Sequence, residues 1–183
     1  MSTYISILRG INVSGHNMIK MDVVRQLYSE LGFSDIQTFI QSGNVIFSSI
    51  SSNTNQLEGA ISKELHDNFG FDIPVLVLTP EELKTALNNN PFINDPIKDP
   101  AFMHLTFLSN LPDRSLIEKI PSNFFLPDEY FISGKTIYLY CPHGYGKTKL
   151  NNSFFENKLK LTATTRNLNT SNELLKLAEK ISQ

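Results

Sequence analysis

Short strand patterns and helix patterns alternate along this chain, and nearly the same order occurs twice. Apolar residues at every second position indicate strands, whereas apolar residues three or four positions apart indicate helices. The first half reads βαββαβ, and the second half repeats βαββα with a weak terminal strand. The predicted strands are residues 4–8, 36–40, 45–48, 74–78, 102–108, 130–132, 136–140 and 162–166. The predicted helices are residues 21–31, 57–69, the segment after Pro80, residues 114–120, 149–158 and the segment after Thr170.

This order of elements predicts an α+β fold built from two tandem, duplicated ferredoxin-like halves. Each half is a split-βαβ unit, or α/β plait, in which helices cover one face of an antiparallel sheet. The first half spans residues 1–90, a connector spans 91–100, and the second half spans 101–183 with an extra C-terminal helix. Strand 75–78 is apolar on both faces, so the sheet face without helices needs a cover, most simply the other half.

Residue types at the helix ends indicate where the predicted helices start and stop. A Thr or Asn followed three residues later by Glu has the spacing of a capping box. The predicted capping pairs are Thr79 with Glu82, Asn55 with Glu58, and Thr170 with Glu173. The predicted left-handed stops are Gly32 and Gly70.

The composition is that of a globular protein, because 40% of the 183 residues are hydrophobic and 10% are aromatic. The longest apolar run, residues 73–78, is far shorter than the roughly 20 residues needed to cross a bilayer. The N-terminus does not resemble a signal peptide, and the single cysteine, Cys141, agrees with a reducing compartment. We therefore expect a soluble, cytoplasmic protein.

Charge is distributed unevenly along the chain, although the net charge is only -2. Residues 1–134 contain eight Lys or Arg and fifteen Asp or Glu, whereas residues 135–183 contain eight and three. Two interpretations are open: the basic end attracts an anionic partner, or it attracts the acidic end of the same chain.

The first candidate site is a glycine-punctuated polar loop, residues 9–17, which we call the first loop. In a split-βαβ sheet the first and third strands are antiparallel neighbours, so this loop is expected beside the hairpin turn 41–44. Its glycines permit left-handed turns close to a ligand, and Arg9 is a forked donor suited to carboxylate or phosphate. The alternative is structural: the glycines only satisfy turn geometry, Arg9 pairs locally, and the Asn side chains cap the loop's own backbone.

Two further candidates lie in the basic third of the chain. Residues 144–149 form a glycine-rich turn with two lysines, but Cys141 stands where a phosphate-binding P-loop needs glycine. A weaker anion site at Lys147 and Lys149 and a flexible loop with solvated lysines are both open readings. The segment 164–167 carries only hydrogen-bonding side chains, and Arg166 is a candidate to join Arg9 and Lys149 around one anion.

Metal and cofactor chemistry is not expected. The four histidines show no metal-ligand spacing, and the paired carboxylates 81–82 and 128–129 read as surface charge. A nucleophilic pair of Cys141 with His143 is conceivable, but a cysteine that closes an apolar strand is more often a small buried hydrophobe.

Three motifs, Leu8-Arg9-Gly10-Ile11-Asn12-Val13, Gln41-Ser42-Gly43-Asn44-Val45 and Thr164-Thr165-Arg166-Asn167, resemble the signature of the bacterial family called domain of unknown function 1697. The resemblance implies the same split-βαβ architecture. It also implies that Lys149 with Leu150 matches the family's Ser-Lys-Leu stretch, with Thr148 in the Ser position. The family usually has an aromatic residue after the Arg-Asn pair, where this chain has Leu168. The family name records no reaction or substrate.

These features support three hypotheses of different classes. The first is a binding protein or enzyme whose ligand is a small anionic or phosphorylated compound. The second is a single-stranded RNA-binding module, although strand 45–48 lacks the basic and aromatic pattern of that class and the pI is about 6.1. The third is an interaction or scaffolding domain without catalysis. The candidate ligand-binding residues of the first hypothesis are Arg9, Gly10, Asn12, Gly15, Asn17, Gln41, Ser42, Gly43, Asn44, Lys149, Thr165, Arg166 and Asn167.

Overall fold

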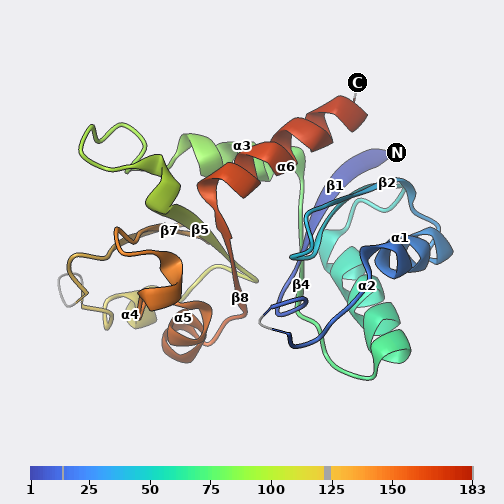
Figure 1. The fold of residues 1–183 in the computed structure, drawn as a ribbon, viewed down its shortest axis with the longest axis horizontal. Coiled ribbons are helices and arrows are strands. Elements are labelled where there is room, and N and C mark those ends of the chain that lie inside the picture. Colours follow the sequence, from blue (N-terminus) through green and yellow to red (C-terminus); the bar gives the residue numbers. More distant parts are fainter. Residues whose placement is uncertain (14, 122–124, 183) are drawn as a thin grey trace. The chain divides into compact units, whose positions relative to one another are not determined.

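The computed structural model describes residues 1–13, 15–121 and 125–182. These residues form two four-stranded antiparallel sheets and six α-helices. The chain divides into two compact units, Met1–Lys84 with Glu173–Gln183 and Thr85–Asn172 (Figure 1). The predicted α+β class and the antiparallel sheets are therefore confirmed.

The first unit contains the order βαββαβ. Its elements are β1 (Ser2–Leu8), α1 (Met21–Glu30), β2 (Ser34–Phe39), β3 (Asn44–Ser49), α2 (Thr54–Phe69) and β4 (Val75–Leu78). The strands lie in the order β2-β3-β1-β4, and each neighbouring pair is antiparallel. Because β1 pairs with both β3 and β4, the first strand of the chain is a central strand of the sheet.

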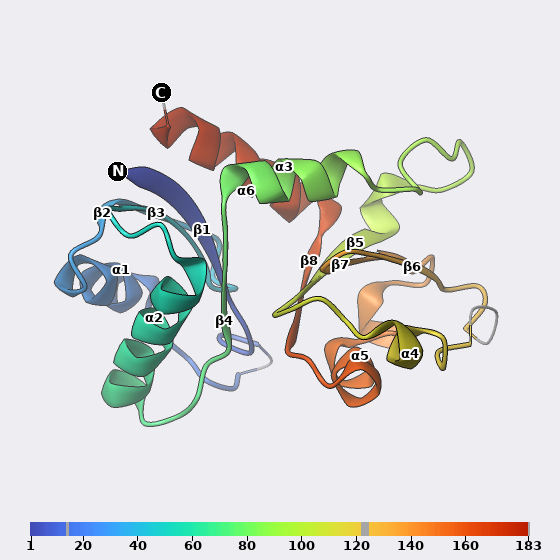
Figure 2. The ribbon, with the colours of Figure 1, turned by 180° about the vertical axis from the view of Figure 1, so that it is seen from behind.

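Both helices of this unit, α1 and α2, lie on one face of its sheet (Figure 2). Their apolar stripes pack on the side chains that alternate strand residues turn toward them, such as Tyr4 and Phe47. The Tyr28 ring on α1 meets Phe47 edge-on with 5.4 Å between ring centroids, and its hydroxyl lies 2.7 Å from Ser6 Oγ. Burial raises the pKa of Tyr28, so this phenol stays protonated and serves the core.

The second unit repeats the order βαββαβ. Its elements are β5 (Met103–Leu108), α4 (Arg114–Ile117), β6 (Glu129–Ser133), β7 (Thr136–Tyr140), α5 (Asn152–Leu159) and β8 (Ala163–Asn167), with short 3-10 turns at Pro100–Phe102 and Tyr145–Lys147. The strand order is β6-β7-β5-β8. The terminal strand that the sequence predicts as weak pairs with β5 along its whole length. A core under α5 includes Leu139, Phe155 and Leu159.

The remaining helices are α3 (Pro80–Asn88) and α6 (Leu168–Ile181), and the division between the units falls inside both. The predicted start of α3 is confirmed, because Thr79 N–H donates to Glu82 Oε2 (2.8 Å) and Glu82 N–H donates to Thr79 Oγ1 (3.1 Å). The predicted left-handed stops Gly32 and Gly70 have φ values of 81° and 76°. No helix in the described part of the chain is long and apolar enough to span a bilayer.

Two predicted helix starts are wrong. The cap of α2 is Asn53, which accepts from Gln56 N–H (3.2 Å), so Asn55 lies inside the helix, and Glu58 instead accepts from Val77 N–H on β4 (2.9 Å). Likewise β8 passes directly into α6, and Asn167 accepts from Thr170 N–H (2.7 Å). Thr170 is therefore a donor in the first turn and not the cap. In both cases an Asn two or three residues earlier in the chain takes the cap position.

Gly43 closes the hairpin between β2 and β3 under two constraints. Its φ is 80°, in the left-handed region that favours glycine. A Cβ atom at this position would lie 2.7 Å from Leu8 Cβ and 2.8 Å from Ile11 Cδ1, closer than real Cβ atoms approach. Both Leu8 and Ile11 are fully buried, so neither side chain has room to withdraw.

We expect Gly43→Ala to lower the free energy of unfolding by about 2–4 kcal/mol, since it adds left-handed strain to overpacking. The matched control is Gly59→Ala in α2, where an added Cβ meets nothing within 4 Å. That variant should gain up to about 1 kcal/mol because alanine favours helix. Urea unfolding of both variants measures the difference, and equal stabilities would contradict the packing explanation.

Candidate functional site

The first loop and the hairpin turn lie in contact at one edge of the first unit's sheet. Leu8 N–H donates to the Gly43 carbonyl oxygen (2.7 Å), and Asn12 Nδ2 donates to the Gln41 carbonyl oxygen (2.8 Å). Arg9 N–H donates to the Pro74 carbonyl oxygen (3.0 Å), which ties the same loop to the start of β4. The predicted proximity of these two segments is confirmed. Ser14, within the first loop, lies outside the described residues.

The Asn12 side chain makes three hydrogen bonds that hold this edge together. Its Oδ1 accepts from Ile19 N–H (2.8 Å), while its Nδ2 donates to the carbonyl oxygens of Ile19 (2.9 Å) and Gln41 (2.8 Å). One amide group therefore joins the end of the first loop to the hairpin turn, because an amide offers an acceptor and two donors in one plane.

The other predicted Asn residues also bond to backbone groups. Asn17 Nδ2 donates to the Gly10 carbonyl oxygen (2.9 Å), and Asn44 Nδ2 donates to the Phe39 carbonyl oxygen (3.1 Å). These bonds agree with the structural interpretation of the Asn side chains, in which the side chains stabilise the loop backbone. A ligand at this edge would thus meet a backbone surface that the asparagines hold in place.

Left-handed backbone is concentrated at this edge. In the described part of the chain twelve residues have positive φ, and half of them belong to the first loop or to residues 40–43. They are Gly10, Asn12, Gly15, Asn17, Ile40 and Gly43. Glycine and asparagine adopt this conformation readily, but a β-branched residue does so rarely. Ile40 nevertheless holds φ 51° while its side chain is 51% exposed.

A polar pocket of about 370 Å³ adjoins the hairpin turn. Its lining consists of Lys20, Met21, Asp22, Arg25, Thr38, Ile40 and Gln41. Arg25 donates to Thr38 Oγ1 (2.5 Å) and forms an ion pair with Asp22. The Lys20 ammonium group, in contrast, has no hydrogen-bonded or ion-paired partner among the described residues. The pocket therefore contains an ammonium group without an ion-pair partner, next to the hairpin turn that contacts the first loop.

The candidate residues of β8 make hydrogen bonds to other residues of the second unit. Thr165 Oγ1 lies 2.7 Å from Thr106 Oγ1 and donates to Asn152 Oδ1 (2.6 Å), and Asn167 caps α6. Burial lowers the pKa of Arg166 to about 10, so its guanidinium stays protonated at neutral pH, and it donates to the Thr165 carbonyl oxygen (2.9 Å). Convergence of Arg9 with Lys149 and Arg166 stays a prediction, because Arg9 belongs to the first unit and the others to the second.

The loop before α5 differs from its prediction. The helix begins at Asn152, capped by Asn151, so Lys149 precedes it and lies in the loop. Tyr145 anchors this loop by donating to Thr165 Oγ1 (3.1 Å), and its ring stacks on His104 with 5.0 Å between centroids.

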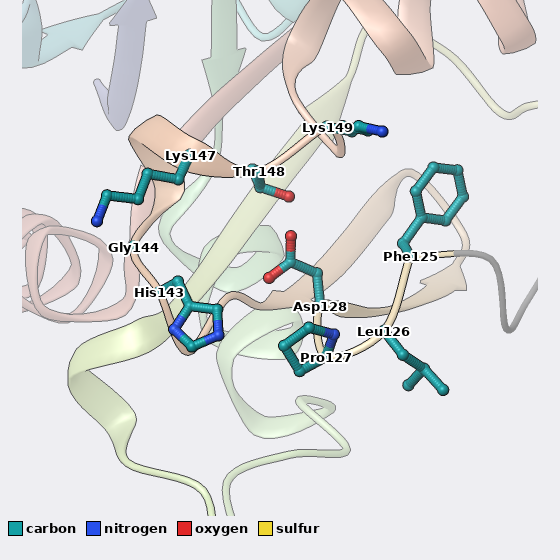
Figure 3. Close-up of a pocket in the computed structure, with 9 residues that line it drawn as sticks. All are labelled: Phe125, Leu126, Pro127, Asp128, His143, Gly144, Lys147, Thr148 and Lys149. Carbon is teal, nitrogen blue, oxygen red and sulfur yellow. The ribbon is translucent and has the colours of Figure 1, made fainter.

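This loop forms one wall of a second pocket, of about 360 Å³, which we call the flank pocket (Figure 3). Its lining consists of Phe125, Leu126, Pro127, Asp128, His143, Gly144, Lys147, Thr148 and Lys149. Asp128 lines this pocket, whereas Glu129 is the first residue of β6 and pairs with Lys98, with its side chain 40% exposed. The two lining segments precede and follow the β6–β7 hairpin, and this flanking position is the sequence signal that could have revealed the pocket.

Nucleophilic chemistry at Cys141 is not supported. Its thiol is buried, and burial together with the Asp128 charge raises its pKa to about 11. It therefore stays protonated at neutral pH, as expected for a small buried hydrophobe. Among the described residues no group of three His, Cys, Asp or Glu side chains is placed to hold a metal ion.

Comparisons with known proteins concern family and fold. A family model described as "Protein of unknown function (DUF1697)" matches residues 1–138, which contain the first loop and the hairpin turn. The chain is also similar in structure to the conserved bacterial protein SP0830 from Streptococcus pneumoniae, with a TM-score of 0.74 and 24% identity. That similarity covers 97% of this chain and 98% of that chain, and it concerns the fold alone. None of the curated proteins matches this chain.

We expect Asn12→Ala to lower the free energy of unfolding by about 3 kcal/mol. The change removes three hydrogen bonds and leaves Ala in a left-handed conformation. Two matched Asn→Ala controls are Asn53, the true cap of α2, which should cost about 1 kcal/mol, and exposed Asn55, which should cost less than about 0.5 kcal/mol. Thermal or urea unfolding ranks the three, and a different order would contradict the assigned contacts.

Proposed function

We propose that this chain, which belongs to the DUF1697 family, binds a small anionic or phosphorylated ligand where the first loop meets the hairpin turn. The observation that carries the proposal is the concentration of left-handed backbone at this edge, beside a polar pocket with an unpaired lysine. Left-handed and turn conformations turn successive N–H groups toward one side, which favours anions. Strained residues persist where the surrounding structure holds them, and they cluster at functional sites.

Ile40 supports the same location. An exposed β-branched side chain gains little from burial, so its left-handed conformation is not explained by packing alone. Because Ile40 lines the pocket, its side chain offers the bound ligand an apolar contact.

The alternative of single-stranded RNA binding has less support. RNA-recognition sheets of this topology stack bases on aromatic side chains of the sheet face that carries no helices. Here Tyr4 on β1 and Phe47 on β3 belong to the core under α1 and α2, with 5.7 Å between their ring centroids. The sheet face away from these helices carries Ile5, Ile7 and Ile46 from the same strands, as strand alternation requires.

The scaffold for this site is proposed to be a pair of ferredoxin-like halves that arose by internal duplication, joined by residues 91–100. The order βαββαβ in each unit and the corresponding strand orders β2-β3-β1-β4 and β6-β7-β5-β8 support that proposal. Fold similarity alone assigns no ligand.

The binding proposal is tested by titrating inorganic phosphate while following backbone amide resonances by NMR. We expect saturable shifts in the first loop and the hairpin turn, and an affinity about tenfold lower in Lys20→Gln, because a charge-assisted contact is lost. The control is Lys180→Gln on α6, another exposed lysine whose side chain has no partner among the described residues, which makes the same change in net charge. Equal weakening in both variants, or shifts elsewhere only, would refute the site.

A separate test concerns Ile40. We expect Ile40→Asn to raise the free energy of unfolding by about 1 kcal/mol, since Asn tolerates the left-handed conformation, and to weaken phosphate-ester binding by removing an apolar contact. Ile50→Asn is the control, because Ile50 is 87% exposed with ordinary backbone and should change stability by less than about 0.5 kcal/mol. A loss of stability in Ile40→Asn would show that this side chain is structural.

A further inference from the structure

The flank pocket of the second unit has two chemically different walls. Phe125, Leu126 and Pro127 form an apolar wall, and the segment 143–149 forms a polar one. The Phe125 ring is held edge-on against Phe154, with 5.0 Å between centroids. A volume of about 360 Å³ lies within the usual range of small-ligand sites, about 300–1,000 Å³.

The polar wall is a loop with fixed anchors. Tyr145 OH donates to Thr165 Oγ1 (3.1 Å), and Thr148 Oγ1 accepts from Leu150 N–H (3.0 Å) and bonds the Cys141 side chain. Because these inward side chains are tied to the interior, the lysines between and after them emerge from a defined backbone. Such support lowers the entropy lost when a ligand binds.

The charges of the pocket are separated in space. Lys147 and Lys149 extend to opposite sides of the polar wall, with Thr148 between them, and the Asp128 carboxylate points toward Thr148 at the centre (Figure 3). Neither lysine, nor the Asp128 carboxylate, has a hydrogen-bonded side-chain partner among the described residues. A bare anion at the centre would be repelled by Asp128. A ligand that places hydroxyl donors at Asp128 and an anionic group at a lysine gives both the carboxylate and the ammonium group a suitable partner.

We propose that the flank pocket is a second ligand site, specific for a small phosphorylated polyhydroxy compound. Its phosphate pairs with Lys147 or Lys149, its hydroxyl groups donate to Asp128, and its C–H face rests on Phe125 and Pro127. The site is independent of the one at the first loop, because all of its residues belong to the second unit.

Ribose 5-phosphate is the probe, with ribose and inorganic phosphate as comparison compounds, and amide resonances of residues 143–149 as the readout. Ribose 5-phosphate should give saturable shifts there at lower concentration than either comparison compound. The double variant Lys147→Gln/Lys149→Gln should lose at least about tenfold in affinity. Lys158→Gln, an exposed lysine of α5 that does not line the pocket, is the control and should bind as the unaltered protein does.

Asp128→Asn separates this proposal from general attraction of anions. The change should weaken ribose 5-phosphate by about tenfold, because the charged acceptor of the hydroxyl groups is lost. It should strengthen inorganic phosphate, because a repelling charge is removed. Two results overturn the proposal: equal or improved binding of ribose 5-phosphate in Asp128→Asn, or weakening in Lys158→Gln as large as in the double variant. Shifts confined to the first loop overturn it as well and leave the first site intact.

Discussion

The antiparallel pairing of β1 with β3 is the constraint on which the proposed first site depends. The register runs from Ser2 opposite Ser49 to Ile7 opposite Asn44, so the end of β1 and the start of β3 coincide at one edge. The next contact along the chain is the bond between Leu8 and Gly43, which carries the pairing into the loops. A shift of β3 by one residue against β1 would put Phe47 on the opposite face of the sheet from Tyr4 and so take Phe47 out of the core. The same hydrophobic burial that holds the sheet therefore also positions the first loop.

The loops at this edge combine tight packing with local strain. Gly43 has no space for a side chain, Asn12 uses its whole amide to join two segments, and Ile40 adopts a conformation that β-branched residues avoid. Such an arrangement persists because the central strands and the core under α1 and α2 supply the stability that the loops lack. Loops that a well-packed sheet holds in place are a common setting for ligand binding.

The second unit has the same order of elements, but its polar residues gather at a different place. Its hairpin, β6 with β7, has Glu129 opposite Tyr140, so the segments outside this pair emerge side by side. One segment carries the apolar residues 125–127 and Asp128, and the other carries the lysines. In the first unit a loop meets a hairpin turn, whereas in the second the polar residues gather at the open end of the hairpin. Two related topologies thus place polar residues at different positions.

The sequence by itself determined the class of fold, every strand, the hairpin turns and the meeting of the first loop with the turn 41–44, because hydrophobic periodicity and strand order are local or topological properties. It did not determine which residue caps α2 and which caps α6, since neighbouring candidates such as Asn53 and Asn55, or Asn167 and Thr170, have similar local preference. Only the tertiary structure decided that the Asn12 amide bonds to backbone groups and that Thr165 and Arg166 bond to residues of the second unit. It also decided that Asp128 lines a pocket. Side-chain partners depend on distances between segments far apart in the chain, and those distances are set by packing.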